Sequence, residues 1–298
     1  MVEIQSVVKK QREYFKSGAT LKVGFRIEML KKLYTTVKKY ESEISEALKQ
    51  DLGKSSFESF MCEIGMVLSE ISYMIKNTKK FASPKRVRTP LAQFASSSYK
   101  KPTPYGNVLI MSPWNYPFLL SIGPLIDAIA AGNTAVIKPS AYSPYTSEIV
   151  RKIVKEVFPE EYVAVVTGGR EENKALLAEK FDYIFLDAPA GVDAGFHLVT
   201  ETADRFLVVT GAGPAAVRDA SRVEELLELA GKKNIRLIVN RVDRDMLSTV
   251  RMTVDDVMDQ AGLPLLGIVP EDPEVVLAAV FEKPLLKQTK KGAAAACR

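Results

Sequence analysis

The sequence has little of three residue types that often carry chemistry: two cysteines, one histidine and one tryptophan occur among 298 residues. Cys62 and Cys297 stand far apart, and neither has a second cysteine at the short spacing of a zinc site or a redox pair. A disulfide framework is not indicated, and a reducing cytoplasm is the expected compartment. With His197 alone, a histidine-based metal cluster or a Ser-His-Asp triad would rest on a single residue, and we expect neither.

Long apolar runs are absent as well. The most apolar stretch, residues 118–137, is interrupted by Asp127, Gly132 and Asn133. No segment therefore reaches the roughly 18 uninterrupted apolar residues that indicate a membrane span. The N-terminus also lacks the apolar core of a secretory signal. We expect a folded, soluble protein without export and without a membrane partner.

Acidic residues are scarce in the first third of the chain. Residues 1–100 carry 19 Lys and Arg against 10 Asp and Glu, whereas the remainder carries 22 against 26. Nucleic-acid binding would require cations and aromatic residues in one compact patch, and the sequence does not indicate such a patch. We interpret the excess cations as solvated helix faces and expect no nucleic-acid partner.

Apolar residues recur at spacings of three and four from Phe25 to Leu52, which predicts one long amphipathic helix ended by Gly53. The same spacing from Met61 to Ile75 predicts a second helix. Residues 83–105 are rich in proline, serine and basic residues. We expect them to form a connecting arm with an edge strand at 94–99.

Seven short, β-rich apolar runs alternate with helical patterns after Gly106: Val108–Met111, Ala135–Ile137, Val163–Val166, Tyr183–Leu186, Phe206–Thr210, Arg236–Asn240 and Leu265–Val269. This alternation predicts an α/β fold with a doubly wound, mainly parallel, Rossmann-like three-layer sheet preceded by N-terminal helices. We expect helices and the arm in 1–105, one half of the sheet in 106–186, and a second half completing it in 187–298. Ligands of such sheets bind beyond the carboxyl ends of the strands.

Two strings follow the first two of these strands: Met111-Ser-Pro-Trp-Asn-Tyr-Pro117 and Lys138-Pro-Ser140. Residues 1–186 thereby resemble the cofactor-binding half of class 3 type aldehyde dehydrogenases. The resemblance implies NAD or NADP as cofactor, with Asn115 donating its side-chain amide to a developing oxyanion. It also implies a set of cofactor contacts, namely Ser112, Pro113, Trp114, Lys138, Ser140 and Gly168.

The sequence departs from this family at two places. Ala141 stands where the family often has a glutamate that binds the adenosine ribose, so NADP is also expected to be tolerated. After Leu186 the family's Phe-Thr-Gly-Ser string, its LELGG string and its catalytic cysteine are missing. Cys62 lies on an apolar helix face, where an inert, buried thiol is expected. We therefore expect dinucleotide binding without catalytic turnover.

Residues 182–298 are similar to the C-terminal half of MinD, the septum-site-determining ATPase of the deviant P-loop class. Five strings carry this resemblance: 183–191, 208–210, 216–220, 237–241 and 264–272. It implies that Asp187 holds Mg²⁺ through water, and that Asn240 and Asp272 lie on the adenine side of a bound nucleotide. The phosphate-binding GxxxxGK[ST] string of such ATPases is absent, which makes ATP-Mg a less favoured cofactor than NAD or NADP.

Residues 181–185 suit both families, which suggests a chimera joined within one strand. Three hypotheses follow: an aldehyde-dehydrogenase-derived NAD(P)-binding protein, a MinD-like adenine-nucleotide switch, or an engineered scaffold without activity. In the second, a homodimer would form through the helix that carries Arg218, Asp219 and Arg222. In all but the scaffold, the expected partner is a small-molecule nucleotide.

Overall fold

The computed structural model describes residues 4–90, 92, 95–186, 194–243 and 253–272. The chain divides into two compact units, Met1–Asp187 and Ala188–Arg298. Each unit has a parallel sheet and an apolar core of its own. The predicted α/β fold class is thus confirmed.

The first unit contains these helices: α1 (Ile4–Lys16), the 3-10 turn η1 (Ala19–Leu21), α2 (Val23–Lys39), α3 (Glu41–Leu52), α4 (Ser56–Ser59), the π-helical turn η2 (Phe60–Ile64), α5 (Gly65–Phe81), α6 (Pro117–Ala131), α7 (Pro144–Val157) and α8 (Arg170–Ala178). Its strands are β1 (Lys85–Val87), β2 (Ser98–Lys100), β3 (Asn107–Met111), β4 (Thr134–Lys138), β5 (Val163–Val165) and β6 (Tyr183–Leu186). The second unit contains α9 (Ala194–Thr202), β7 (Phe206–Gly211), α10 (Pro214–Leu229), β8 (Ile235–Val242), α12 (Val254–Ala261) and β9 (Leu265–Pro270).

The predicted helix from Phe25 to Leu52 is in fact two helices, α2 and α3, which meet at Tyr40. Tyr40 leaves helical geometry with φ −98° and ψ 12°, and its N–H donates to the carbonyl of Thr36. Apolar periodicity continues across this bend, so spacing alone could not locate it. The predicted stop is confirmed, because Gly53 ends α3 with φ +69°, a left-handed conformation that glycine adopts without strain.

The main sheet of the first unit has four parallel strands in the order β5-β4-β3-β6. The chain runs outward from β3 through β4 to β5 and then returns to the other side of β3 with β6. The strand order therefore reverses between β3 and β6, and the crevice beyond the carboxyl ends of these strands is where doubly wound sheets bind ligands.

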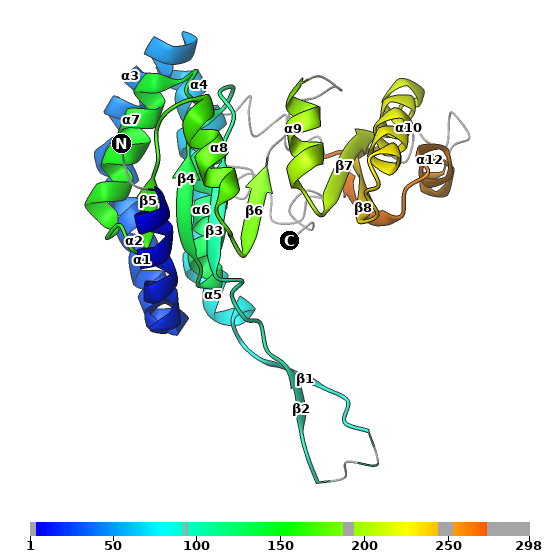
Figure 1. Cartoon of the computed structure of the whole chain (residues 1–298), viewed down its shortest axis with the longest axis horizontal. Coiled ribbons are helices and arrows are strands. Elements are labelled where there is room, and N and C mark those ends of the chain that lie inside the picture. The colour runs from blue at the N-terminus through cyan, green and yellow to red at the C-terminus, as the bar shows by residue number, and fades with distance from the viewer. Residues whose placement is uncertain (1–3, 91, 93–94, 187–193, 244–252, 273–298) are drawn as a thin grey trace. The chain divides into compact units, whose positions relative to one another are not determined.

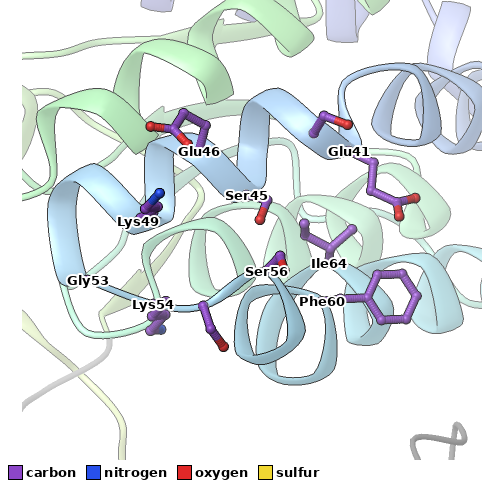
Figure 2. Close-up of a pocket in the computed structure, with 11 residues that line it drawn as sticks. Glu41, Ser45, Glu46, Lys49, Gly53, Lys54, Ser56, Phe60 and Ile64 are labelled. Carbon is purple, nitrogen blue, oxygen red and sulfur yellow. The ribbon is translucent and has the colours of Figure 1, made fainter.

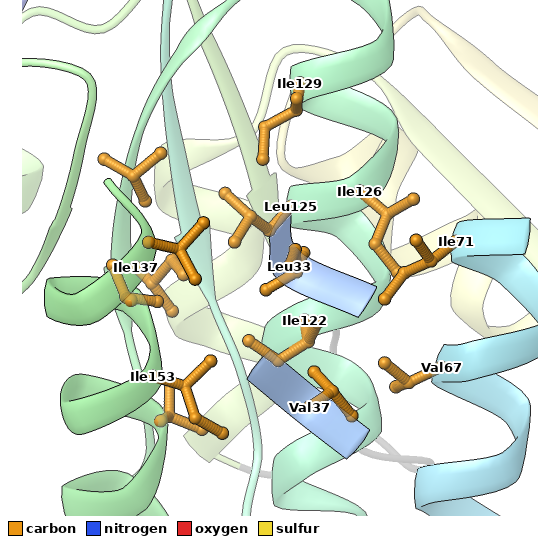
Figure 3. Close-up of a cluster of buried hydrophobic side chains, with 14 of the residues drawn as sticks. Leu33, Val37, Val67, Ile71, Ile122, Leu125, Ile126, Ile129, Ile137 and Ile153 are labelled. Carbon is orange, nitrogen blue, oxygen red and sulfur yellow. The ribbon is translucent and has the colours of Figure 1, made fainter. Parts of the chain in front are cut away.

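Two helical layers cover this sheet. On one face, side chains of α2, α5, α6 and α7 interdigitate with those of β4 in a fully buried core, as Figure 3 shows for Leu33, Val67, Ile122, Ile137 and Ile153. On the other face, α1 and α8 contribute Val7 and Leu176 to a smaller cluster with inward-facing residues of β3, β4 and β5. Cover on both faces explains why the strands read as continuous apolar runs.

The connecting arm is a two-stranded antiparallel hairpin of β1 and β2, which extends away from the helices and main sheet of the first unit (Figure 1). The predicted edge strand at 94–99 is shifted, because β2 comprises Ser98–Lys100 and pairs with β1. Positions 93 and 94 lie outside the described residues.

The strands of the second unit form a parallel sheet in the order β7-β8-β9. All seven predicted strands after Gly106 are thus present. We expected the last three to complete the first sheet, and instead they hydrogen-bond to one another. The pairing partner of a parallel strand depends on long-range packing, which the local pattern does not encode. Among the described residues, no helix is long and apolar enough to cross a bilayer.

Candidate functional site

The loops after β3 and β4 meet at the carboxyl edge of the first sheet. Met111 is paired with Lys138, the last residue of β4, and the N–H of Ser112 donates to the Lys138 carbonyl at 3.2 Å. Ser112 is also held by its hydroxyl, which lies 2.7 Å from the Ser121 hydroxyl on α6. The structure therefore brings Ser112 and Lys138 together; their role as cofactor contacts stays a prediction.

The Trp114-Asn115-Tyr116 segment stands exposed at this edge. Trp114 is 54% exposed, so its indole is not part of the core. The Asn115 side-chain oxygen accepts from the N–H of Tyr116 at 3.1 Å, and its Nδ2 has no partner within the described part of the chain. Asn115 thus keeps a free amide donor, which is what stabilisation of an oxyanion requires.

A buried ion pair between Lys54 and Glu63 holds the loop that contains Asn115. The Lys54 ammonium lies 2.6 Å from a carboxylate oxygen of Glu63 and also donates to the Asn115 carbonyl at 3.0 Å. It lies 4.1 Å from the centroid of the Tyr116 ring, within the range of a cation–π contact. Lys54 therefore holds the backbone of Asn115 in place.

The other carboxylate oxygen of Glu63 closes the N-terminus of α6. It accepts from the N–H of Phe118 at 2.8 Å and of Leu119 at 3.1 Å. A helix N-terminus attracts anions, and here a buried side chain supplies the anion. Sequence reasoning assigned no role to Lys54 or Glu63. The available signal was a glutamate within an apolar-periodic helical stretch.

Lys138 is buried, with 3% of its surface exposed, so it is not a solvated surface cation. Its ammonium donates to the Pro139 carbonyl at 2.8 Å. Burial lowers the pKa of Lys138, while the charge of Glu172 acts in the opposite direction. The following loop is braced by Ser140, whose hydroxyl accepts from the N–H of Tyr142 at 3.2 Å and whose carbonyl accepts from the Ser147 hydroxyl at 2.9 Å.

Gly168 and Glu172 shape the loop after β5. Gly168 has φ +136°, and a Cβ built on it would lie 2.3 Å from the Glu172 carboxyl carbon. The Glu172 carboxylate accepts from the N–H of Gly169 at 2.7 Å, and hydrogen bonds from its own N–H and that of Gly169 lower its pKa. Gly168 is needed here so that Glu172 can pack against the backbone. Its role as a cofactor contact stays a prediction.

The predicted nucleotide contacts of the second unit have local partners. The Asn240 side-chain oxygen accepts from the N–H of Arg241 at 3.0 Å, next to a backbone φ of +54° at Arg241. Asp272 is buried, and Asp187 lies outside the described residues. No group of three His, Cys, Asp or Glu suitable for a metal occurs among the residues whose placement is described.

A groove of about 510 Å³ lies between α3 and the α4–η2 turn (Figure 2). Four serines, two glutamates and two lysines line it together with Phe60 and Ile64. Lys54 is the residue that this groove shares with the contacts to Asn115. None of the site residues predicted from the sequence lines it, so the groove is separate from the candidate site at the sheet edge.

The profile of the aldehyde dehydrogenase family matches residues 2–262. The chain is 40% identical over 218 residues to the 4,4'-diaponeurosporen-aldehyde dehydrogenase of Staphylococcus aureus, covering 72% of this chain and 47% of that protein. It is 41% identical over 182 residues to the 4,4'-diapolycopene-4,4'-dial dehydrogenase of Cytobacillus firmus, covering 61% and 40%. The chain thus spans about half the length, or less, of these relatives.

The structure is similar to that of Staphylococcus aureus AldH in a substrate-bound state, with a TM-score of 0.64 and 31% identity over 98% of this chain and 62% of that one. A glyceraldehyde-3-phosphate dehydrogenase from Methanocaldococcus jannaschii, at 17% identity and a TM-score of 0.56, shares the fold; the match covers 83% of this chain and 57% of that one. The family profile runs through the expected junction at 181–185 and gives no support for a MinD-type segment. Because it spans most of the 298 residues, the chain belongs to the aldehyde dehydrogenase family.

Proposed function

We propose that the chain binds a nicotinamide dinucleotide, NAD or NADP, beyond the carboxyl ends of β3 and β4. The observation that carries this proposal is the pairing of an exposed indole, Trp114, with a buried ammonium, Lys138, on two loops that hydrogen-bond to each other. The loop after β3 borders the point between β3 and β6 where the strand order reverses, at which doubly wound sheets bind nucleotides.

The residues at this edge suit such a cofactor. An ammonium has three N–H donors, and the Pro139 carbonyl takes one from Lys138, so two are available for ribose hydroxyls. The exposed indole of Trp114 and the half-buried ring of Pro113 offer apolar contact beside the adenosine. The pyrophosphate, in contrast, is not expected at the N-terminus of α6, since Glu63 already occupies its N–H groups.

We propose that this chain by itself does not oxidise aldehydes. A bound NAD accepts a hydride, and Asn115 offers a donor to the substrate oxygen. The nucleophile, however, is missing from the region after β6 in which the family resemblance places it. Cys62 is a free, half-buried thiol in η2, less buried than we expected, and Cys297 lies outside the described residues.

The substrate class is proposed from the two bacterial relatives. Their names specify aldehydes of long, apolar polyenes. We infer that an aldehyde presented to Asn115 belongs to that apolar class. A cytoplasmic location and a homodimer stay predictions from the sequence.

Calorimetric titration with NAD and with NADP tests this function. We expect saturable binding of at least one of them and weaker binding by the Lys138→Met variant. With a long-chain aldehyde added, NADH formation should not exceed the rate without protein. The absence of saturable heat with both dinucleotides would refute the binding, and aldehyde-dependent NADH formation that is lost in Asn115→Ala would refute the inactivity.

A second candidate, from the sequence resemblance alone, is an adenine-nucleotide module in the second unit, Ala188–Arg298. This unit has its own parallel sheet and core, which is compatible with the MinD-like strings. Two observations favour the first proposal. The side-chain oxygen of Asn240 already accepts a hydrogen bond from the N–H of Arg241, and the family profile matches through residue 262. Micromolar binding of ATP-Mg, lost in Asn240→Ala and kept in Lys138→Met, would support the second candidate instead.

A further inference from the structure

Glu172 places a carboxylate at the same sheet edge as Lys138. The loop after β5 is next to the loop after β4, because these strands pair in parallel and the N–H of Val166 donates to the Ile137 carbonyl at 2.9 Å. Glu172 lies in the first turn of α8, which begins directly after the β5 loop. An acidic side chain therefore lies near the ammonium to which we assign the ribose hydroxyls.

The charges of Glu172 and Lys138 act on each other. Burial lowers the pKa of the Lys138 ammonium, and the negative charge of Glu172 opposes this shift. Hydrogen bonds from the N–H groups of Glu172 and Gly169 lower the pKa of the Glu172 carboxyl, and the charge of Lys138 acts in the same direction. Glu172 is therefore ionised at neutral pH and close enough to Lys138 for their charges to interact.

The backbone of the β5 loop holds the Glu172 carboxylate in place. Its Oε2 accepts from the N–H of Gly169 at 2.7 Å, and the carboxylate packs against Gly168, which has no side chain to displace it. Among the described residues, no side chain donates a hydrogen bond to Glu172, so its other oxygen keeps lone pairs for a ligand. Because this carboxylate already neutralises the N-terminus of α8, the helix attracts an added phosphate less strongly.

A hydroxyl matches Lys138 and Glu172 together better than a phosphate does. The ammonium only donates hydrogen bonds and the carboxylate only accepts them, whereas a hydroxyl does both. In NADP the adenosine ribose carries a phosphate on its 2′-oxygen, and this negative charge would be repelled by the carboxylate. We propose that Glu172 accepts a hydrogen bond from the 2′-hydroxyl of the adenosine ribose and thereby selects NAD over NADP.

This selection rests on the proposed dinucleotide site and narrows its cofactor to NAD. From Ala141 we expected NADP to be tolerated, because the loop after β4 has no acidic side chain at that position. Glu172 supplies the acid from the neighbouring loop instead. Its proximity to Lys138 arises from the pairing of β4 with β5, which spacing along the chain does not encode.

Arg170, the first residue of α8, is the alternative partner for this position of the ribose. Its guanidinium is exposed and is a suitable partner for a phosphate, which would select NADP. We favour Glu172 because hydrogen bonds hold its carboxylate next to the loop, whereas the Arg170 side chain has no such contact within the described part of the chain.

Calorimetric titrations with NAD and with NADP give two dissociation constants, and their ratio tests this selection. We expect the original chain to bind NAD about tenfold more tightly than NADP, because the repulsive contact acts on NADP alone. Glu172→Gln removes the charge and keeps the shape and the hydrogen bond from Gly169. In this variant the ratio should fall about fivefold, chiefly through tighter binding of NADP.

Glu171→Gln is the matched control, because it removes the neighbouring acid of the same helix. Glu171 is exposed and lies 3.6 Å from the Lys174 ammonium, so the ratio should equal that of the original chain. Circular dichroism should show both variants folded.

Three results would contradict the role of Glu172. An equal change of the ratio in the two glutamine variants would assign the effect to the net charge of α8. Binding of both dinucleotides with the same ratio in the original chain and in Glu172→Gln would overturn the selection and leave the dinucleotide site intact. NADP binding that is at least as tight as NAD binding and is lost in Arg170→Gln would assign the position to Arg170. Saturable binding of neither dinucleotide would refute the proposed function and this selection with it.

Discussion

Arg26 is a buried cation whose partners are all backbone carbonyls. Its guanidinium donates to Thr20 and Leu21 and to Ala130 and Ala131, so it satisfies carbonyls at the end of α6. Burial lowers its pKa. The close approach of Arg26 to the chain at Gly132 is possible because that residue has no side chain. A Cβ there would lie 2.5 Å from the guanidinium carbon.

We predict that Gly132→Ala destabilises the fold by about 2–4 kcal/mol, because φ at this position is +95° and the new methyl displaces Arg26. Gly24→Ala is the matched control. Gly24 lies in α2 with no atom within 4 Å of a built Cβ, so alanine should stabilise it by about 0.5–1 kcal/mol. Chemical denaturation measures both changes, and equal effects of the two substitutions would contradict this account.

Asp127 supplies a pH-dependent contribution to stability. Desolvation by the surrounding protein and then the charge of Glu70 raise its pKa to about 6, from a reference of 3.8. Between pH 3.8 and about 6, the Asp127 carboxyl is therefore protonated in the folded state and ionised in the unfolded state. Stability from this group is present below pH 4 and is lost as pH rises through about 6.

Asp127→Asn should remove this decrease in folding stability at higher pH, because asparagine does not ionise. The variant should gain stability relative to the original chain as pH rises from about 4 to 7. Although neighbouring protein atoms partly desolvate the Asp127 carboxyl, the residue lies exposed at the surface, so solvent screening should keep the gain small. Denaturation at both pH values measures it, and a gain that is constant or shrinks toward pH 7 would be the contrary result.

At the scale of elements, Lys54 and Glu63 join three parts of the first unit. Lys54 follows the end of α3, Glu63 lies in the π-helical turn η2, and together they hold the loop and first turn of α6. A buried pair that satisfies several hydrogen bonds is costly to break, because removal of one partner leaves an uncompensated charge.

A double-mutant cycle tests this linkage. Lys54→Met and Glu63→Gln should each cost about 3–5 kcal/mol of unfolding free energy. The double variant should cost less than the sum of the two, since no unpaired charge remains buried. Additive losses would show that the two side chains act independently.

Helices and strands could be predicted from the sequence where neighbouring residues alone determine them. The four strands of the first sheet read as apolar runs because helices cover both faces of that parallel sheet. In the second sheet, β7 and β9 have the same apolar pattern but expose Leu207, Val209, Leu266 and Ile268. Gly53 ended its helix as expected, since only glycine adopts φ +69° without strain. The bend at Tyr40 and the partners of Lys54 could not be predicted, because both depend on residues distant in sequence.

For the whole chain, the local sequence pattern could not predict how the strands are divided between sheets. Seven alternating strands are compatible with one sheet or two, and the hydrogen bonds give two. At the candidate site, the strings around Trp114 and Lys138 correctly predicted a shared sheet edge. The burial of Lys138 and the glutamate that packs on Gly168 became visible only with the structure. The excess cations of residues 1–100 were interpreted as solvated helix faces, although four of them, Lys85, Arg86, Arg88 and Lys100, belong to the hairpin and its flanks.

A fluorescence titration can detect a dinucleotide bound beside Trp114 and Lys138. Trp114 is the single tryptophan of the chain, so its emission reports on this loop alone. We predict saturable quenching by NADH, about tenfold weaker in Lys138→Met, because one hydrogen bond from a charged donor is worth roughly 1.5–3 kcal/mol. Lys155→Met, which removes an exposed cation of α7, should titrate like the original chain. Quenching that does not saturate, or that is the same in all three proteins, would contradict the account.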